Sequence, residues 1–193
     1  YERWRERKLA RYPRRTEDLI VEVRDPRNLR ASEVEEIRRI CSAANLAVYR
    51  SPLDGIADKD IARRVGERLG LAGVLSNPLA DEDGISALEV TPEKSALGYI
   101  PYSNRGLRWH TDGYYNAPER RINAFTLHCV RPAASGGENR FLYHEIAYIL
   151  LRDADPAYVE ALSAPDAMTI PANATTGMEF RRAMSGPVYS ADI

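Results

Sequence analysis

Apolar residues in the first part of the chain recur at spacings that alternate between strand and helix. Residues 19–23 and 46–49 are short runs rich in β-branched and apolar side chains, which predict two strands. Between them, a capping-box pattern begins at Ser32, and apolar residues then recur on one face over 34–44. This order predicts a strand, a helix and a second strand.

Two further helices are expected in the same part of the chain. Residues 1–12 predict a short basic helix, and residues 58–71 predict a helix that ends at Gly70 or Gly73. We therefore expect residues 1–78 to form an α/β N-terminal segment.

The pattern changes after Pro78 to many short apolar stretches separated by Gly, Pro and Asn turns. The predicted strands are 85–90, 97–102, 122–130, 140–143, 167–170 and 188–193. A helix interrupts them over 145–151 and resumes over 157–162. Such a series predicts a mainly β fold with a helical periphery, a jelly roll, over residues 79–193. The sequence has no recognisable interdomain linker and no internal repeat, so we expect residues 1–193 to form a single domain.

The two ends bear on how complete this domain is. The chain begins at Tyr1 rather than at a methionine, and it stops at Ile193 inside an alternating apolar stretch with no turn after it. We therefore expect the jelly roll to be incomplete. Unpaired sheet edges would invite another chain, which leaves a homo-oligomer open.

Composition narrows the classes of partner. The formal net charge is −1, so no basic field indicates nucleic acid. No apolar run reaches the ~20 residues that span a bilayer, and no charged-then-apolar leader is present. Cys41 and Cys129 lie in apolar surroundings, and we expect buried free thiols in a reducing compartment. The expected location is cytoplasmic, with a small molecule as substrate.

The candidate chemistry lies at His110-Thr111-Asp112. In an extended segment, residues two apart point the same way, so this imidazole and this carboxylate could both reach one metal ion. Two histidines and one carboxylate on one face of an octahedron form the ligand set of non-haem Fe(II) oxygenases. Gly113 gives a tight exit into the loop that follows. A histidine beside an aspartate in an exposed turn is the commoner alternative for such a short motif.

The downstream sequence favours the metal interpretation. The stretch 127–139, Leu-His-Cys-Val-Arg-Pro-Ala-Ala-Ser-Gly-Gly-Glu-Asn, follows His-Thr-Asp-Gly and precedes a predicted helix. Over roughly residues 99–151, this order resembles the TauD/TfdA superfamily of Fe(II)/2-oxoglutarate dioxygenases. Within it, the Leu-His-Cys and Gly-Gly-Glu portions are most similar to the gamma-butyrobetaine hydroxylase branch.

The resemblance implies a double-stranded β-helix that uses Fe(II), 2-oxoglutarate and O2. It implies hydroxylation of a small molecule, with decarboxylation of 2-oxoglutarate to succinate. His110 and Asp112 match the first two iron ligands. Asn139 falls where many members have a hydroxyl residue that binds the cosubstrate, although a turn residue after Gly-Gly is an equal alternative. Tyr114 and Tyr115 could line the substrate pocket, as an aromatic cage for a trimethylammonium group in that branch, or could simply fill strands.

The sequence also departs from the family pattern. Members have a distal histidine ligand followed by an arginine that pairs with 2-oxoglutarate, and nothing here matches either. The only other histidines are His128, expected in the core or behind the ligands, and His144, expected to cap a helix or lie on the surface. Arg181 and Arg182 fall in a polar helical or loop stretch without a match to the cosubstrate arginine.

Two alternatives follow. One is a non-catalytic or truncated jelly-roll protein that serves in binding or assembly without a complete metal site. The other is a zinc hydrolase that uses His110, Asp112 and either His128 or His144, which the lack of a helical HExxH motif disfavours.

Overall fold

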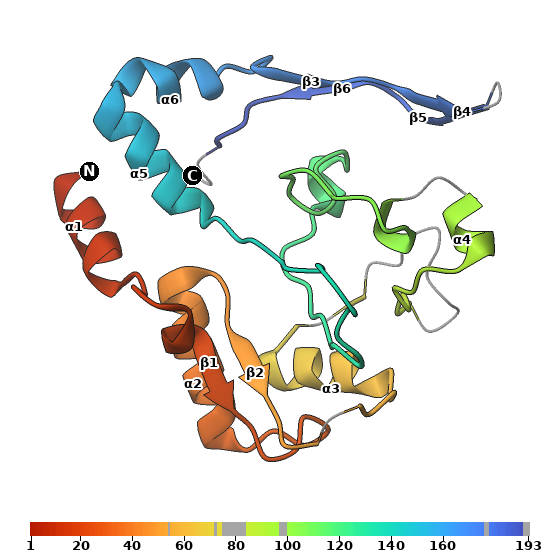
Figure 1. The fold of residues 1–193 in the computed structure, drawn as a ribbon. Coiled ribbons are helices and arrows are strands. Elements are labelled where there is room, and N and C mark those ends of the chain that lie inside the picture. The colour runs from red at the N-terminus through yellow and green to blue at the C-terminus, as the bar shows by residue number, and fades with distance from the viewer. Residues whose placement is uncertain (54, 72, 75–83, 97–99, 176–177, 191–193) are drawn as a thin grey trace. The chain divides into compact units, whose positions relative to one another are not determined.

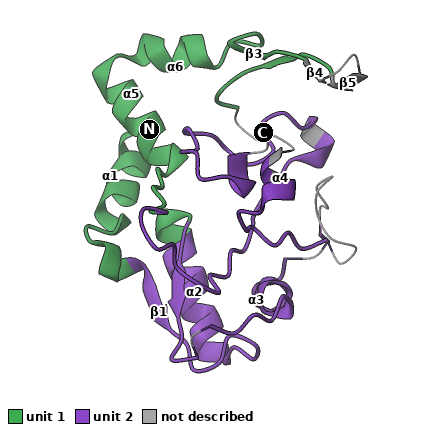
Figure 2. Ribbon diagram, turned by 45° about the vertical axis from the view of Figure 1, so that its right-hand side comes forward, with its two compact units in different colours: residues 1–18, 42–45, 138–193 green, residues 19–41, 46–137 purple. Residues whose placement is uncertain are grey.

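The computed structural model of residues 1–193 describes the chain apart from residues 54, 72, 75–83, 97–99, 176–177 and 191–193 (Figure 1). The described residues divide into two compact units (Figure 2). Unit 1 comprises residues 1–18, 42–45 and 138–193, and unit 2 comprises residues 19–41 and 46–137.

Unit 2 begins with the predicted strand–helix–strand order. Strand β1 (Ile20–Glu22) pairs in parallel with β2 (Val48–Arg50), and helix α2 (Ala31–Ala44) lies between them in the chain. Parallel strands cannot be joined by a tight turn, so a crossover element is needed, and α2 supplies it. Helix α3 (Asp60–Leu69) follows. These elements confirm both predicted strands and both predicted helices of this region.

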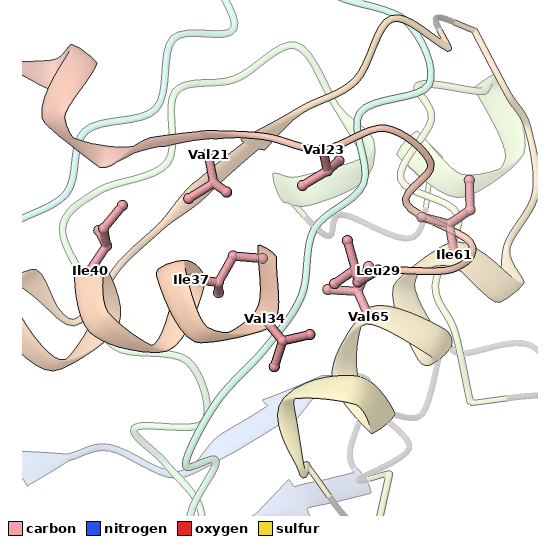
Figure 3. Close-up of a cluster of buried hydrophobic side chains, with 8 residues drawn as sticks. All are labelled: Val21, Val23, Leu29, Val34, Ile37, Ile40, Ile61 and Val65. Atoms are coloured by element: carbon pink, nitrogen blue, oxygen red, sulfur yellow. The ribbon is translucent and has the colours of Figure 1, made fainter. Parts of the chain in front are cut away.

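Eight buried apolar side chains form the core of unit 2 (Figure 3). They come from β1 and the residues after it, from one face of α2 and from α3, and they point toward one another: Val21, Val23, Leu29, Val34, Ile37, Ile40, Ile61 and Val65. The helical spacing in the sequence placed Val34, Ile37 and Ile40 on one stripe, and the structure buries that stripe.

The ends of helices α2 and α3 agree with the sequence prediction, except at the start of α2. Helix α2 begins at Ala31, so Ser32 is not its capping residue. Glu33 instead accepts hydrogen bonds from the backbone N–H groups of Arg30, at 2.6 Å, and Arg24, at 2.9 Å. The acidic half of the capping box is therefore Glu33, two residues earlier than the Glu35 that the pattern from Ser32 predicts. Helix α3 ends at Gly70, whose φ of 86° is the left-handed conformation that glycine adopts freely.

The rest of unit 2 is built from turns and short helices: α4 (Pro92–Ala96) and the 3-10 helices η2 (Ile100–Tyr102) and η3 (Pro118–Arg120). The strands predicted at 85–90 and 122–130 are wrong, because these described residues belong to no strand. Of the strand predicted at 97–102, residues 97–99 lie outside the described residues and the remainder is η2.

The alternation behind the prediction at 122–130 is nevertheless visible. Thr126, His128 and Val130 are half-buried, whereas Leu127 and Cys129 are exposed. The sequence pattern thus predicted which side chains face inward. A strand also needs a paired neighbour, which such a pattern does not specify. The jelly roll itself stays a prediction.

Unit 1 contains helices α1 (Glu2–Arg11), α5 (His144–Ala154) and α6 (Pro156–Leu162). Two antiparallel ladders follow: β3 (Met168–Ile170) pairs with β6 (Met184–Gly186), and β4 (Asn173–Thr175) pairs with β5 (Met178–Arg181). The three helices and the strand at 167–170 confirm predictions.

Three expectations in unit 1 are wrong. Residues 140–143 are not a strand, and the described part of 188–193 is not one either; residues 191–193 lie outside the described residues. Arg181 ends a strand rather than lying in a helix or loop.

Helices α1 and α5 of unit 1 are joined by a small polar cluster beside an apolar one. Lys8 donates to the hydroxyl of Tyr143 at 2.9 Å and pairs with Glu145, which also accepts from Tyr143. Tyr143 packs with Ile146 and Ile149 of α5, and Trp4 packs against them.

Within the described part of the chain, no helix is long and apolar enough to cross a membrane.

Candidate metal centre

His110 is oriented by the backbone of its own segment. Its Nδ1 lies 2.7 Å from the carbonyl oxygen of Arg108. A carbonyl oxygen only accepts, so Nδ1 carries the hydrogen and donates it. In the neutral ring, the lone pair is then on Nε2, which is the tautomer that a metal-binding histidine needs.

Asp112 lies opposite that nitrogen. Its Oδ1 is 3.3 Å from His110 Nε2, and the two side chains are 34% and 45% exposed. An imidazole lone pair and a carboxylate oxygen repel each other unless a proton or a metal cation is shared between them. The predicted convergence of the two side chains is therefore present, although Asp112 begins a turn rather than continuing a strand.

The turn after the pair depends on Gly113. Its φ is +65°, a conformation that other residues rarely adopt. A Cβ atom here would come within 2.7 Å of Asn116 Nδ2 and 2.9 Å of Ile122 Cδ1. The expected tight exit at Gly113 is thus found, and it brings Asn116 and Ile122 close to Gly113.

Tyr114 and Tyr115, the predicted substrate-binding residues, occupy this turn. Their ring centroids are 5.1 Å apart at 76°, an edge-to-face pair, and their residues are 50% and 40% exposed. Two exposed aromatic faces directly after a ligand pair could contact a small molecule held there. Whether they do so stays a prediction.

His128 is held in a different way from His110. Its Nδ1 lies 2.8 Å from the hydroxyl of Tyr49, and its Nε2 lies 3.2 Å from the carbonyl oxygen of Ile56. Since the carbonyl only accepts, Nε2 donates to it and Nδ1 accepts from the tyrosine. Both ring nitrogens are thus occupied, which argues against His128 as a ligand of the alternative zinc site. The expectation of a core or supporting histidine agrees with this placement.

Tyr49 is a residue of this unit that the sequence did not single out. Burial raises the pKa of its hydroxyl to about 12, with a smaller contribution from Cys129, so the hydroxyl keeps the hydrogen that it donates to His128. The two residues are separated by 79 positions. Nothing in a single sequence connects two positions so far apart.

The remaining candidates are Asn139, His144 and the two cysteines. Asn139 belongs to unit 1, is exposed, and makes no side-chain hydrogen bond within the described part of the chain. His144, also in unit 1, is exposed and lies edge-to-face with Tyr143 at 5.1 Å, which fits the expected surface contact. Cys129 is exposed and Cys41 only half-buried, so the expectation of two buried thiols is wrong.

The described residues bring together two candidate ligands and no group of three His, Cys, Asp or Glu side chains suited to a metal ion. A histidine with a free Nε2 facing a carboxylate two residues later corresponds to part of the ligand set of the non-haem metal oxygenases. A family model described as "Taurine catabolism dioxygenase TauD, TfdA family" matches residues 7–185. The chain therefore belongs to the TauD/TfdA family, which indicates a dioxygenase.

The family match covers both units and includes all the candidate residues. It is a match to the family as a whole and does not select the gamma-butyrobetaine hydroxylase branch. No curated protein and no solved structure matches the chain.

Proposed function

We propose that this chain carries the histidine–aspartate half of the active centre of an Fe(II)- and 2-oxoglutarate-dependent dioxygenase that hydroxylates a small molecule. The observation that carries the proposal is the approach of His110 Nε2 to Asp112 Oδ1 at 3.3 Å in a chain of the TauD/TfdA family. The approach of the two side chains would not be sufficient without the family match, because short His-x-Asp sequences are common. The family match alone would not be sufficient either, because it does not say which side chains meet.

The two side chains fit a metal ion by distance. Two bonds of about 2.1 Å at a right angle place the bound atoms about 3.0 Å apart, close to the separation of His110 Nε2 and Asp112 Oδ1. The Arg108 carbonyl fixes the tautomer of His110 and the orientation of its ring, which is the usual support for a ligating histidine. Nitrogen and oxygen donors of this kind suit Fe(II).

When bound, iron with 2-oxoglutarate and O2 would supply the oxidising power that yields succinate, CO2 and a hydroxylated substrate. The residues of the chain have simpler tasks. His110 and Asp112 hold the ion on one side, and Asp112 offsets part of its charge. Tyr114 and Tyr115 offer aromatic surface to the substrate. Asn139 would donate a hydrogen bond to the cosubstrate, in the role that the family resemblance implies.

Turnover of 2-oxoglutarate tests the proposal. The full-length protein is incubated with Fe(II), O2, ascorbate and 2-oxoglutarate, and succinate is measured. We expect succinate formation, and we expect His110→Ala and Asp112→Ala to abolish it. His144→Ala, which removes an exposed histidine of unit 1, is the matched control and should retain it. Full turnover by His110→Ala would overturn the proposal.

The second candidate is a non-catalytic binding or assembly protein of the same family. It is favoured by one observation, that the described residues bring together two ligands rather than three. The two candidates differ in the same assay. Binding of a divalent metal at His110 without any succinate formation would favour the non-catalytic protein.

A further inference from the structure

The residues that follow Asp112 form a loop closed by its own hydrogen bonds. The backbone N–H of Tyr114 donates to the carbonyl of Thr111 at 3.2 Å, and that of Asn116 donates to Gly113 at 2.7 Å. The side-chain amide of Asn116 then donates to the carbonyl of Arg120 at 3.0 Å. Asn116 thus contacts both ends of the loop. Its backbone N–H donates to Gly113 at the start, and its side chain donates to Arg120 at the end.

The return of the chain is tight at Gly113. Ile122, two residues past Arg120, lies so close to Gly113 that a Cβ atom there would come within 2.9 Å of its Cδ1. The chain just past the closed loop over residues 113–120 therefore packs directly against the start of the loop at Gly113.

The position of Asp112 depends on this loop more than on its own side chain. The carbonyls on either side of it, those of Thr111 and Gly113, both accept hydrogen bonds from the loop. Its carboxylate has no polar partner other than His110 among the residues that the structure describes. With no donor to hold the carboxylate, its direction is set by the backbone, and the backbone is set by the loop.

We propose that Asn116 is a positioning residue for the metal centre: its hydrogen bond to the Arg120 carbonyl keeps the loop closed and thereby holds the Asp112 carboxylate toward His110 Nε2. This inference rests on the proposed metal centre and deepens it. The same hydrogen bond keeps Tyr114 and Tyr115 next to the ligand pair, so it also sets where a substrate could be contacted.

The test replaces Asn116 by a residue of similar shape that cannot donate. Asn116→Leu removes the amide at constant charge, and Asn116→Ser is a milder change whose hydroxyl is too short to reach Arg120. Asn123→Leu is the matched control, since Asn123 is exposed and its side chain makes no hydrogen bond within the described residues. The affinity for Mn(II) is measured from the broadening of the His110 ring signals, and the midpoint of thermal unfolding is measured for each variant.

We expect Asn116→Leu to weaken Mn(II) binding about 10- to 100-fold, the usual effect of removing a group that orients a ligand. Asn116→Ser should weaken it less, and Asn123→Leu should leave it unchanged. His128→Ala serves as a control for stability, because it should lower the unfolding midpoint without lowering Mn(II) affinity.

Two failures can be told apart. If the unmodified chain shows no Mn(II) effect at His110, the proposed metal centre is wrong. If the chain binds Mn(II) through His110 but both Asn116 variants bind it as tightly as Asn123→Leu, only the positioning role is wrong. If Asn116→Leu does not fold, Asn116→Ser decides the matter by the same comparison.

Discussion

His110 and His128 lie in the same compact unit and are held in opposite ways. The partners of His110, Arg108 and Asp112, are each two residues away along the chain. The partners of His128, Tyr49 and Ile56, are 79 and 72 residues away. The first histidine keeps one ring nitrogen facing a carboxylate, whereas the second uses both nitrogens in hydrogen bonds that join distant segments.

The comparison shows what makes a histidine available for chemistry. A local turn can orient an imidazole through one nitrogen and leave the other for a ligand. A histidine that joins distant segments contributes to stability, and a metal would have to break one of its hydrogen bonds. We therefore expect substitutions at the two positions to separate metal binding from stability.

The largest effect is expected on metal binding at His110. His110→Ala should abolish Mn(II) binding at the centre, because it removes one of the two donors that the described residues bring together. It should change the free energy of unfolding by no more than about 0.5 kcal/mol, as is usual for an exposed side chain with local contacts. Urea unfolding measures the second quantity. A large loss of stability would show that His110 is structural.

The reverse is expected at His128. His128→Ala leaves the hydroxyl of Tyr49 and the carbonyl of Ile56 without their partner. Leaving such half-buried groups unpaired should lower the free energy of unfolding by about 1–3 kcal/mol. Mn(II) affinity should stay at the level of the unmodified chain. A variant that loses Mn(II) binding while remaining folded would remove the distinction between the two histidines.

A smaller effect is expected at Tyr49. Tyr49→Phe keeps the ring and removes the donor to His128 Nδ1, which should cost about 1 kcal/mol. Since the two residues share one hydrogen bond, the double variant Tyr49→Phe/His128→Ala should lose less than the sum of the single losses. Strictly additive losses would mean that the hydrogen bond does not contribute.

The smallest effect is a dependence on alkaline pH. Burial raises the pKa of Tyr49 to about 12, above its value of about 10 in the unfolded chain. The folded state therefore binds this proton more tightly, and the resulting stability is full below pH 10 and is lost as the pH rises toward 12. The difference in stability between the chain and Tyr49→Phe should shrink over this range. A difference in stability that stays constant over this range would mean that the hydroxyl of Tyr49 is not shielded from water.

Sequence patterns predicted the features that depend on neighbours in the chain. The apolar stripe of α2, the glycine end of α3 and the convergence of His110 with Asp112 are all local. Features that depend on distant residues were not predictable. The strand expected at 122–130 has the right alternation of inward and outward side chains but belongs to no ladder, and no pattern connected Tyr49 with His128.

The account rests on His110 as the ligand among the three histidines of the chain. Three histidines give three resolvable sets of ring signals, so the most direct measurement is an NMR titration with substoichiometric Mn(II), which broadens signals near the ion. We expect the ring signals of His110 to broaden first and most strongly, and we expect Asp112→Ala to suppress the effect. A sharp His110 signal, or equal broadening of all three histidines, would contradict the account.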